Sequence, residues 1–254
     1  MILEIQDISK HFGGLAALSG VGFGIERGEI LGLIGPNGAG KTTLFNVMTG
    51  FLPPTRGKIL FQDEDVTGLR PDQVARKGLV RTFQGTDLFK RKTVLENLMV
   101  AHHLQIRSGF WGLLGNSARA RGDEAAARLG SLEILDYLGL TDLKDELAQN
   151  LPHGHQRALG VAVALAAQPK LLLLDEPLTG MNPEESRRFI EIIRGLRERG
   201  ISLMVVEHDM KAIMGLSQRI VVLNYGRKIA EGTPREVQDN QQVIEAYLGS
   251  GTIP

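Results

Sequence analysis

Apolar residues occur along the chain in two patterns, short continuous runs and helical repeats. The runs at 170–175 and 201–209, KLLLLD and ISLMVVEHD, are typical of strands that a parallel sheet buries on both faces. Residues 1–61 are rich in β-branched and apolar positions separated by turn signals, which favours further short strands. The predicted strands cover residues 2–9, 17–25, 30–35, 57–62, 80–84, 170–175 and 201–209, with a last pair in 219–232 that turns at Tyr225–Gly226.

The middle of the chain carries helical repeats. Residues 93–96, TVLE, form a capping-box pattern ahead of apolar positions spaced three and four residues apart, which predicts a helix. Asp123 precedes a second repeat, EAAARLGSLEILDYLGL, and we predict that it is the N-cap. Residues 141–142 start a shorter turn. Residues 85–160 are therefore expected to form a helical subdomain inserted in an α/β core.

Two further helices follow the buried strands. Asn182 is a good N-cap, Pro183 suits the first helical position, and Gly200 ends the segment RRFIEIIRGLRER. Asp209 is the predicted start of the next helix. These strand–helix alternations indicate a core with a parallel sheet.

The segment 107–122, RSGFWGLLGNSARARG, interrupts the helical pattern of apolar residues. Phe110, Trp111, Leu113 and Leu114 lie there among glycines, where a regular helix is not expected. Apolar side chains in such an insertion either fold back on their own helices or meet a partner. We expect them to pack within the helical subdomain.

Residues 29–43, EILGLIGPNGAGKTT, join an apolar strand to a glycine-rich turn that opens a helix. Successive N–H groups of such a turn can point at an anion on the helix N-terminus. In the pattern G-x-x-x-x-G-K-[ST], Lys41 reaches the β- and γ-phosphates and the Thr42 hydroxyl coordinates Mg²⁺. A glycine-rich turn without a ligand is the alternative, but the flanking strand and helix favour a nucleoside triphosphate site. Its expected binding residues are Gly35, Pro36, Asn37, Gly38, Ala39, Gly40, Lys41, Thr42 and Thr43.

Composition narrows the class of protein. The 254 residues allow one domain with an appendage. Lys+Arg and Asp+Glu both number 29, so the chain lacks the overall excess of basic residues that is typical of nucleic-acid-binding proteins, and no nucleic acid is expected as a partner. The chain contains no cysteine and begins without a basic segment followed by an apolar one, which favours the cytosol. Its apolar runs are shorter than the roughly 20 residues of a membrane span.

Four polar side chains lie at the ends of predicted strands, at the sheet edge where the phosphate loop lies. Asp175 can hold Mg²⁺, and Glu176 can orient and polarise a water that attacks the γ-phosphate. His208 can donate to a γ-phosphate oxygen, and Gln84 can bind Mg²⁺ or the attacking water. The alternatives are an acidic approach to the next helix for the two carboxylates and structural roles for His208 and Gln84.

Together these residues resemble the ATP-binding subunit of an ABC transporter. The likeness covers nearly the whole chain and is carried by the phosphate loop 35–43, Gln84, LPHGHQR at 151–157, LLLLDEP at 171–177, TGMN at 179–182 and the histidine of VVEHD. The resemblance implies hydrolysis of ATP, with Mg²⁺, at two sites between a pair of such subunits. Each site combines one subunit's phosphate loop with the other's signature loop.

The resemblance also assigns two residues that their local pattern leaves open. Phe12, which taken alone is more often a core residue, occupies the family's adenine-stacking position, where one stacked base is worth about 1–3 kcal/mol. Gly154, in the signature loop, is expected to bind nucleotide in trans, at the partner's site.

The signature loop departs from the family's LSGGQ pattern. Pro152 replaces the serine, His153 a glycine and His155 the glutamine, so the serine hydroxyl that would touch the γ-phosphate is absent. Gly154 remains, and backbone N–H groups at the following helix could still bind phosphate, more weakly. Asn182 stands where many relatives have aspartate in the dimer-contact turn.

Within the family the chain looks most like an ATPase subunit of the branched-chain amino-acid importers. That likeness rests on HFGGLAAL, RTFQGTDLF with its TVLENL helix, the insertion near Trp111, TGMNP and the tail GTPREV…VIEAYLG. Related systems carry other amino acids, amides or urea. The alternatives are an ATPase of lipopolysaccharide export, a soluble ABC-type ATPase in DNA repair or translation, and, less favoured, a GTPase or small-molecule kinase.

These inferences combine into one expected organisation. The fold class is α/β, a P-loop NTPase core with a parallel sheet, an N-terminal antiparallel β subdomain and an inserted α-helical subdomain. A single ABC-type ATPase domain is expected over 1–254, with 1–84 and 161–254 forming the core and 85–160 the helical subdomain with the signature loop. The expected partners are a second ATPase subunit, in a heterodimer or possibly a homodimer, and transmembrane permease subunits that hold the chain on the cytoplasmic face of the membrane.

Overall fold

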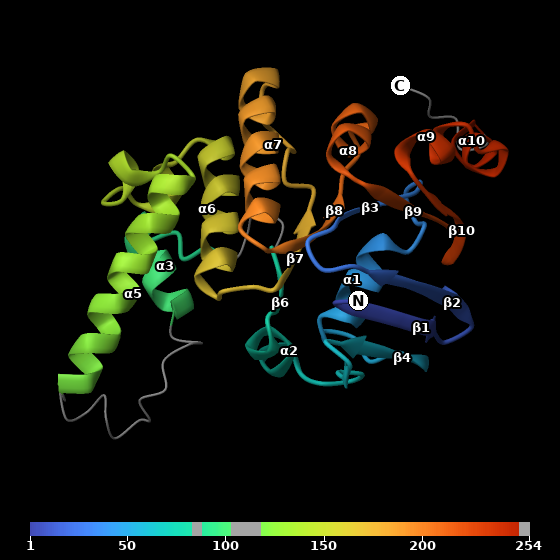
Figure 1. Cartoon of the computed structure of the whole chain (residues 1–254), viewed down its shortest axis with the longest axis horizontal. Helices are drawn as coiled ribbons and strands as arrows, with labels where there is room; N and C mark the ends of the chain where they lie inside the picture. Colours follow the sequence, from blue (N-terminus) through green and yellow to red (C-terminus); the bar gives the residue numbers. More distant parts are fainter. Residues whose placement is uncertain (83–87, 103–117, 249–254) are drawn as a thin grey trace. The chain divides into compact units, whose positions relative to one another are not determined.

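The computed structural model describes residues 1–82, 88–102 and 118–248, which divide into two compact units (Figure 1). Unit 1 comprises residues 1–81, 170–177 and 193–254, and unit 2 comprises 82–169 and 178–192, each within the described ranges. The expectations for Gln84 and for Phe110–Leu114 fall outside the described residues.

Unit 1 contains a six-stranded sheet in the order β10-β9-β3-β8-β7-β6. The strands from β9 to β6 are parallel, and β10 pairs antiparallel with β9. Every residue of β7 and β8 is buried, which confirms the interpretation of their apolar runs as strands covered on both faces, and every residue of β3, predicted as a short strand, is buried as well. The strands are β3 Ile30–Ile34, β6 Leu79–Arg81, β7 Leu171–Asp175, β8 Ser202–Val206, β9 Arg219–Asn224 and β10 Arg227–Gly232.

An antiparallel sheet of four strands, in the order β2-β1-β4-β5, completes the strands of unit 1 and confirms the expected N-terminal β subdomain. Its first two strands are longer than predicted, because they continue to the tight turn at Gly13–Gly14. A continuous hydrophobic core joins this sheet, α1 and the six-stranded sheet, and Phe45 of α1 is fully buried in it. The strands are β1 Leu3–Phe12, β2 Leu15–Ile25, β4 Arg56–Phe61 and β5 Glu64–Asp65.

The described residues of unit 1 include the short helices α1 Lys41–Met48, α2 Pro71–Lys77, α8 Met210–Leu216, α9 Pro234–Gln238 and α10 Gln241–Leu248. Helix α2 was not predicted from the sequence, because it buries only Val74 and therefore has no apolar repeat. In Figure 1, α1 lies between β3 and the antiparallel strands, and α8, α9 and α10 lie beside β8 to β10.

Arg219, at the start of β9, joins three strand ends of unit 1. Its Nε donates to Oε1 of Glu29 at 2.9 Å, Nη2 donates to the Gly24 carbonyl at 2.7 Å, and Nη1 pairs with Glu231. The hydrogen bond to Glu29 raises the pKa of Arg219, with burial opposing it. The ends of β2, β3 and β10 are thereby fixed to β9, which supports the strand that leads into the phosphate loop.

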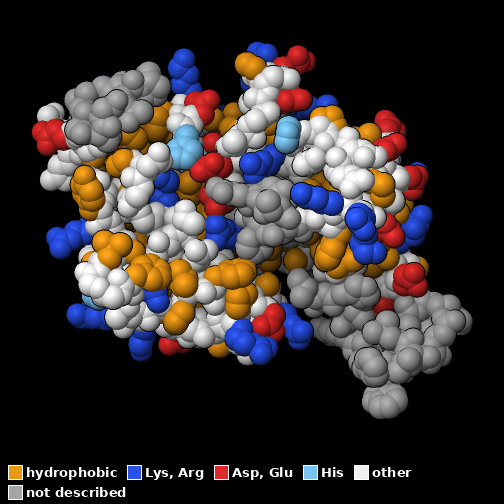
Figure 2. Space-filling view, turned by 180° about the vertical axis from the view of Figure 1, so that it is seen from behind, with side chains coloured by type: hydrophobic (Ala, Val, Ile, Leu, Met, Phe, Trp, Pro, Cys, Tyr) orange, Lys and Arg blue, Asp and Glu red, His pale blue; other side chains and the backbone are white. Residues whose placement is uncertain are grey.

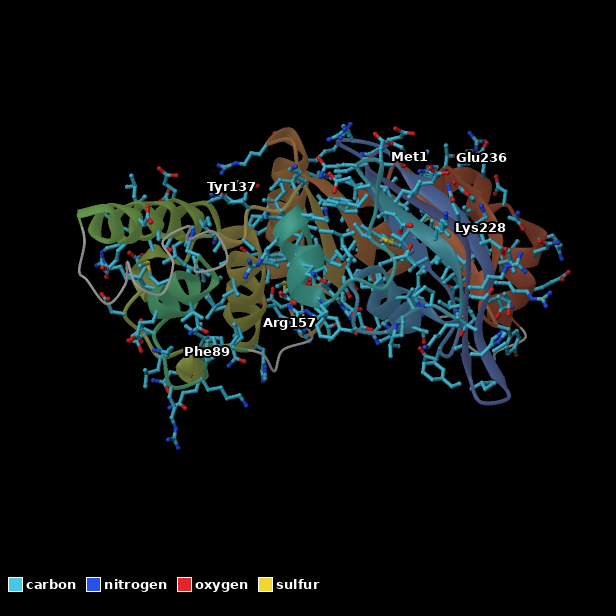
Figure 3. The ribbon with its side chains drawn as sticks, turned by 90° about the horizontal axis from the view of Figure 1, so that it is seen from below. Met1, Phe89, Tyr137, Arg157, Lys228 and Glu236 are labelled. Atoms are coloured by element: carbon cyan, nitrogen blue, oxygen red, sulfur yellow. The ribbon has the colours of Figure 1, made fainter. Side chains whose placement is uncertain are left out.

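Unit 2 is helical. Helices α3, α5 and α6 pack against one another, and the first part of α7 belongs to the same unit. Tyr137, labelled in Figure 3, donates its hydroxyl to the Ile192 carbonyl at 2.6 Å and so joins α5 to α7. The elements are α3 Val94–His102, α5 Ala118–Tyr137, η1 Thr141–Leu143, η2 Ala148–Asn150, α6 His153–Ala166 and α7 Pro183–Glu198, whose last residues belong to unit 1.

The predicted helix starts in unit 2 are confirmed with one exception. Thr93 and Glu96 make both bonds of the capping box, and the Asn182 side chain accepts from the N–H groups of residues 184 and 185. Asp123 is not an N-cap, because α5 already begins at Ala118 and Asp123 lies inside it. Alanine and arginine at 118–121 are good helix formers, which explains the earlier start.

None of the helices in the described part of the chain combines the length and apolar composition needed to cross a membrane. On the face shown in Figure 2, positive and negative side chains are interspersed, in keeping with the equal numbers of basic and acidic residues, 29 each.

Candidate nucleotide-binding site

The phosphate loop of unit 1 connects β3 to α1. Gly40 is the N-cap of α1 with φ 103°, and an added Cβ would lie 2.8 Å from the Ala17 carbonyl oxygen. An added Cβ on Gly35, at φ 153°, would lie 2.1 Å from the carbonyl oxygen of Leu223. Both positions therefore require glycine, because the loop runs tightly against β2 and β9. Residues 37–43, which end the loop and begin α1, line the pocket described below.

Lys41 is held against the loop that precedes it. Its Nζ donates to the Gly35 carbonyl at 2.6 Å and to the Pro36 carbonyl at 3.1 Å. Burial lowers the pKa of Lys41, and the charges of Glu176 and Asp175 oppose this. An ammonium group that is partly desolvated and bonded only to neutral carbonyls is well placed to exchange them for phosphate oxygens.

Asp175 and Glu176 stand at the carboxyl end of β7. Asp175 is buried, and Glu176 adopts φ 50°, a left-handed conformation that is uncommon for a residue other than glycine. The Glu176 N–H donates to the Val206 carbonyl at 2.9 Å, which holds this turn against the neighbouring strand β8. Backbone strain of this kind persists where the surroundings impose it, and it is concentrated at functional sites.

His208 lies against Glu176. Its Nε2 is 2.8 Å from Oε1 of Glu176, and because an ionised carboxylate only accepts, the ring donates its Nε2 proton. Asp209, the next residue, caps α8 by accepting from the N–H groups of Lys211 at 2.8 Å and Ala212 at 3.1 Å. The prediction that a helix starts at Asp209 is confirmed, and this cap fixes the backbone that carries His208.

Arg81 is a site residue that the sequence did not indicate. It ends β6, and its Nη2 donates to Oδ2 of Asp175 at 2.6 Å. The side chains are 8% and 4% exposed, so both charges are buried. The one signal in the sequence is an arginine in an otherwise apolar strand, which does not by itself identify the carboxylate it meets.

These elements surround a pocket of about 460 Å³ in unit 1. Phe12 lines it with 46% of its surface exposed and lies outside the hydrophobic core, with Nζ of Lys10 5.2 Å from the centre of its ring. A flat apolar ring and an ammonium group in one pocket match the base and the phosphates of a nucleotide. The lining residues are Phe12, Leu15, Ala16, Ala17, Asn37, Gly38, Ala39, Gly40, Lys41, Thr42, Thr43, Asp175, Glu176, Val206, His208, Tyr225 and Gly226.

The pocket brings together most of the residues that the sequence singled out. Phe12, Lys41 and Thr42 line it, as do the two carboxylates of β7 and His208. Gly35 and Pro36 are not among the lining residues, but their carbonyls accept the hydrogen bonds of Lys41. Tyr225 and Gly226 are additional lining residues that strand prediction identified only as a turn.

The signature segment 151–157 belongs to unit 2. Pro152 is the N-cap of α6 and makes no side-chain cap hydrogen bond, and Arg157, labelled in Figure 3, is the fifth residue of the helix. Nδ1 of His155 is buried without a hydrogen-bond partner in the structure. A Cβ added to Gly154 would lie 3.4 Å from Oε2 of Glu185, so a carboxylate already lies beside the start of this helix.

The fold and the pocket define a P-loop nucleoside-triphosphatase. A glycine-rich loop leads into a helix that begins with Lys41, and two acidic residues stand at the carboxyl end of a buried parallel strand of the same sheet. A family model described as "ABC transporter" matches residues 18–179, and a second, "Branched-chain amino acid ATP-binding cassette transporter", matches residues 227–252. The chain belongs to the family of ABC transporter ATP-binding proteins, which hydrolyse ATP to power transport.

Relatives match over almost the entire length. The chain is 45% identical over 251 residues to the high-affinity branched-chain amino acid transport ATP-binding protein LivG of Escherichia coli, covering 98% of each chain. It is 42% identical over 249 residues to the corresponding protein BraF of Pseudomonas aeruginosa, again covering 98% of each. A crystal structure of a nucleotide-free ATP-binding cassette from an ABC transporter superposes with a TM-score of 0.85 and 32% identity, covering 97% of this chain and 98% of that chain.

Proposed function

We propose that this chain is an ATPase subunit of an importer for branched-chain amino acids or for chemically related amino acids and amides. The observation that carries the proposal is the match to importer subunits over 98% of both chains, with a C-terminal segment matched by a branched-chain amino acid transporter model. The chain works on the cytoplasmic face of the membrane, where permease subunits hold it.

The pocket residues divide into binding and chemical roles. Lys41 and the N–H groups of residues 35–43 hold the β- and γ-phosphates, and Phe12 stacks on the adenine. Glu176 is the general base that orients the attacking water, and His208 fixes that carboxylate from one side. In this arrangement the ring of His208 is available to donate to a γ-phosphate oxygen when nucleotide replaces its contact with Glu176.

The donor set suits Mg²⁺. Magnesium in nucleotide sites is held by one or two carboxylates, hydroxyls and the phosphates themselves, with several waters, so a single buried carboxylate and a threonine hydroxyl in one pocket are the expected protein ligands. Asp175 and Thr42 would hold the ion, with Gln84 as a further ligand. Bound there, Mg²⁺ would neutralise charge that develops on the phosphates.

ATP-binding cassettes of this family work as dimers with transmembrane permease subunits. We propose that the partner is a different ATPase subunit whose signature loop is intact, with a homodimer as the alternative. Gly154 of this chain then contributes to the site built on the partner's phosphate loop. The replacements at Pro152 and His155 support this pairing, because two copies of this chain would both lack the signature serine.

Reconstitution tests the proposal directly. The chain, its partner ATPase and the permease are placed in proteoliposomes, and uptake of radiolabelled leucine, isoleucine and valine is followed with ATP and the periplasmic binding component. We expect ATP-dependent uptake that disappears with Glu176→Gln. An assembled transporter that hydrolyses ATP and takes up none of the amino acids or amides tested would overturn the substrate assignment while leaving the ATPase assignment intact.

A further inference from the structure

Arg81, on β6, is held by groups from two other elements of unit 1, β7 and α1. Its Nη2 donates to Oδ2 of Asp175 on β7 at 2.6 Å, and Nη1 donates to Oδ1 of Asn46 on α1 at 2.6 Å. The guanidinium carbon lies 5.3 Å from the centre of the Phe45 ring, also on α1. The planar, forked guanidinium is therefore fixed in one orientation, a geometry that lysine cannot reproduce.

The ion pair with Asp175 belongs to a wider group of buried and half-buried charges. Burial lowers the pKa of Lys41, and the charges of Glu176 and Asp175 partly oppose this lowering. The hydrogen bonds of Lys41 nevertheless go to the carbonyls of Gly35 and Pro36. Asp175 thus accepts a hydrogen bond from Arg81, on the side of β6, whereas Lys41 bonds to the carbonyls of the phosphate loop.

We propose that Arg81 is a positioning residue of the ATPase site, which fixes the Asp175 carboxylate and balances its charge so that Lys41 stays available to the phosphates. The proposal rests on the roles proposed above for Asp175 and Lys41. Arg81 is not among the residues that line the pocket; it acts through Asp175, which is, and through its contacts with α1.

If the ion pair between Arg81 and Asp175 were purely structural, its loss would affect stability and not the affinity for ATP. Breaking a buried pair by removing one partner is strongly destabilising whatever the pair does, so loss of stability alone does not support the proposal. The quantity that distinguishes the two roles is the affinity for ATP in the presence of EDTA. Without metal, this affinity depends on the contacts that Lys41 and the phosphate loop make with the nucleotide. It is compared between the parent protein and the Asp175→Asn protein, in which the carboxylate charge is absent.

The first test is Arg81→Lys, measured by calorimetric titration with ATP in EDTA. We expect affinity to fall about tenfold, because an Asp175 carboxylate that is no longer fixed competes with the phosphates for Lys41. In the Asp175→Asn background the same change should alter affinity by less than about twofold. Arg56→Lys is the matched control, because Arg56 forms an exposed ion pair with Asp7 at 3.0 Å on the antiparallel sheet, and it should leave affinity unchanged.

Equal losses in the two backgrounds, or no loss in the parent, would overturn the proposal. If Arg81→Lys does not fold, the double variant Arg81→Met with Asp175→Asn removes both charges of the pair. We expect it to bind ATP in EDTA as Asp175→Asn alone does, and a further loss would overturn the proposal. The variant Lys41→Ala distinguishes a failure of this proposal from a failure of the proposed function. Normal ATP affinity in Lys41→Ala would refute the phosphate site itself. Normal ATP affinity in Arg81→Lys together with weakened affinity in Lys41→Ala would refute only the role of Arg81.

Discussion

The pocket of unit 1 and the signature segment of unit 2 hold their functional groups in different ways. In the pocket, Lys41, Glu176 and His208 are each held by hydrogen bonds, and the helix after His208 has an aspartate cap. The signature helix α6 begins at Pro152 with no side-chain cap. We infer that the chain supplies the hydrolytic groups of its own site and fewer phosphate donors for the site it would share with a partner.

This difference predicts that the two ATP sites of the assembled transporter are unequal. Hydrolysis should be concentrated at the site built on Lys41 and Glu176, where the partner supplies an intact signature loop. The opposite site would bind ATP and turn over slowly, because it receives Gly154 without the serine hydroxyl. The following changes test this asymmetry, from the largest expected effect to the smallest.

Glu176→Gln should lower the ATPase rate of the assembled transporter by about 10²–10⁴, because it removes a positioned general base while leaving the phosphate contacts in place. Steady-state phosphate release gives the rate, and a titration with ATP should show that binding is retained. The control is removal of the partner's catalytic glutamate, which should cost much less. Equal losses from the two removals would defeat the asymmetric model.

Restoring the signature loop should reduce the asymmetry. In a Glu176→Gln background, which silences this chain's own site, Pro152→Ser with His155→Gln should raise the remaining turnover by about 10²–10³, the usual value of one donor to the transferring phosphate. Pro152→Ala with His155→Ala is the control, because it removes the same side chains without supplying a donor. An equal rise in both variants would show that relief of the bulky residues, and not the serine, restores the rate.

Lys41→Ala should weaken ATP binding by about 10–100-fold, since a charged hydrogen bond is worth about 1.5–3 kcal/mol and this one acts already in the ground state. Calorimetric titration measures the affinity directly. Lys58→Ala, at an exposed position on β4, is the control and should bind ATP as the parent does. Unchanged affinity for Lys41→Ala would contradict the assignment of the phosphate loop.

The smallest effect concerns the two helix starts themselves. Asp209→Ala should destabilise the protein by about 1 kcal/mol, because it removes the two hydrogen bonds that cap α8. Pro152→Ser should act in the opposite direction, by a similar or smaller amount, because it offers α6 a cap that it lacks. Urea denaturation of the isolated chain measures both. A destabilising Pro152→Ser would mean that the proline, and not the missing cap, determines how α6 begins.

Much of the fold follows from local pattern. Strands β7 and β8 could be predicted because continuous apolar runs leave no exposed face, and β3 because a short apolar run leads into the glycine-rich turn. The helix starts at Thr93, Asn182 and Asp209 could be predicted because caps are local hydrogen bonds. Prediction failed where the local signal was weak. Helix α2 buries a single apolar side chain, and α5 begins before the residue that resembled its cap.

The residues of the site likewise fall into those that the sequence indicated and those that only the tertiary structure revealed. The phosphate loop is contiguous in sequence, so its glycines and Lys41 could be recognised directly, and a shared sheet edge explains why strand-end residues such as Asp175 and His208 line one pocket. The sequence therefore determined the class of site and most of its members. It could not indicate that Glu176 takes a left-handed conformation or that Arg81 reaches Asp175, 94 residues away. Those features depend on tertiary structure, because the pairing of buried charges is decided by which side chains the packed strands bring within hydrogen-bonding distance.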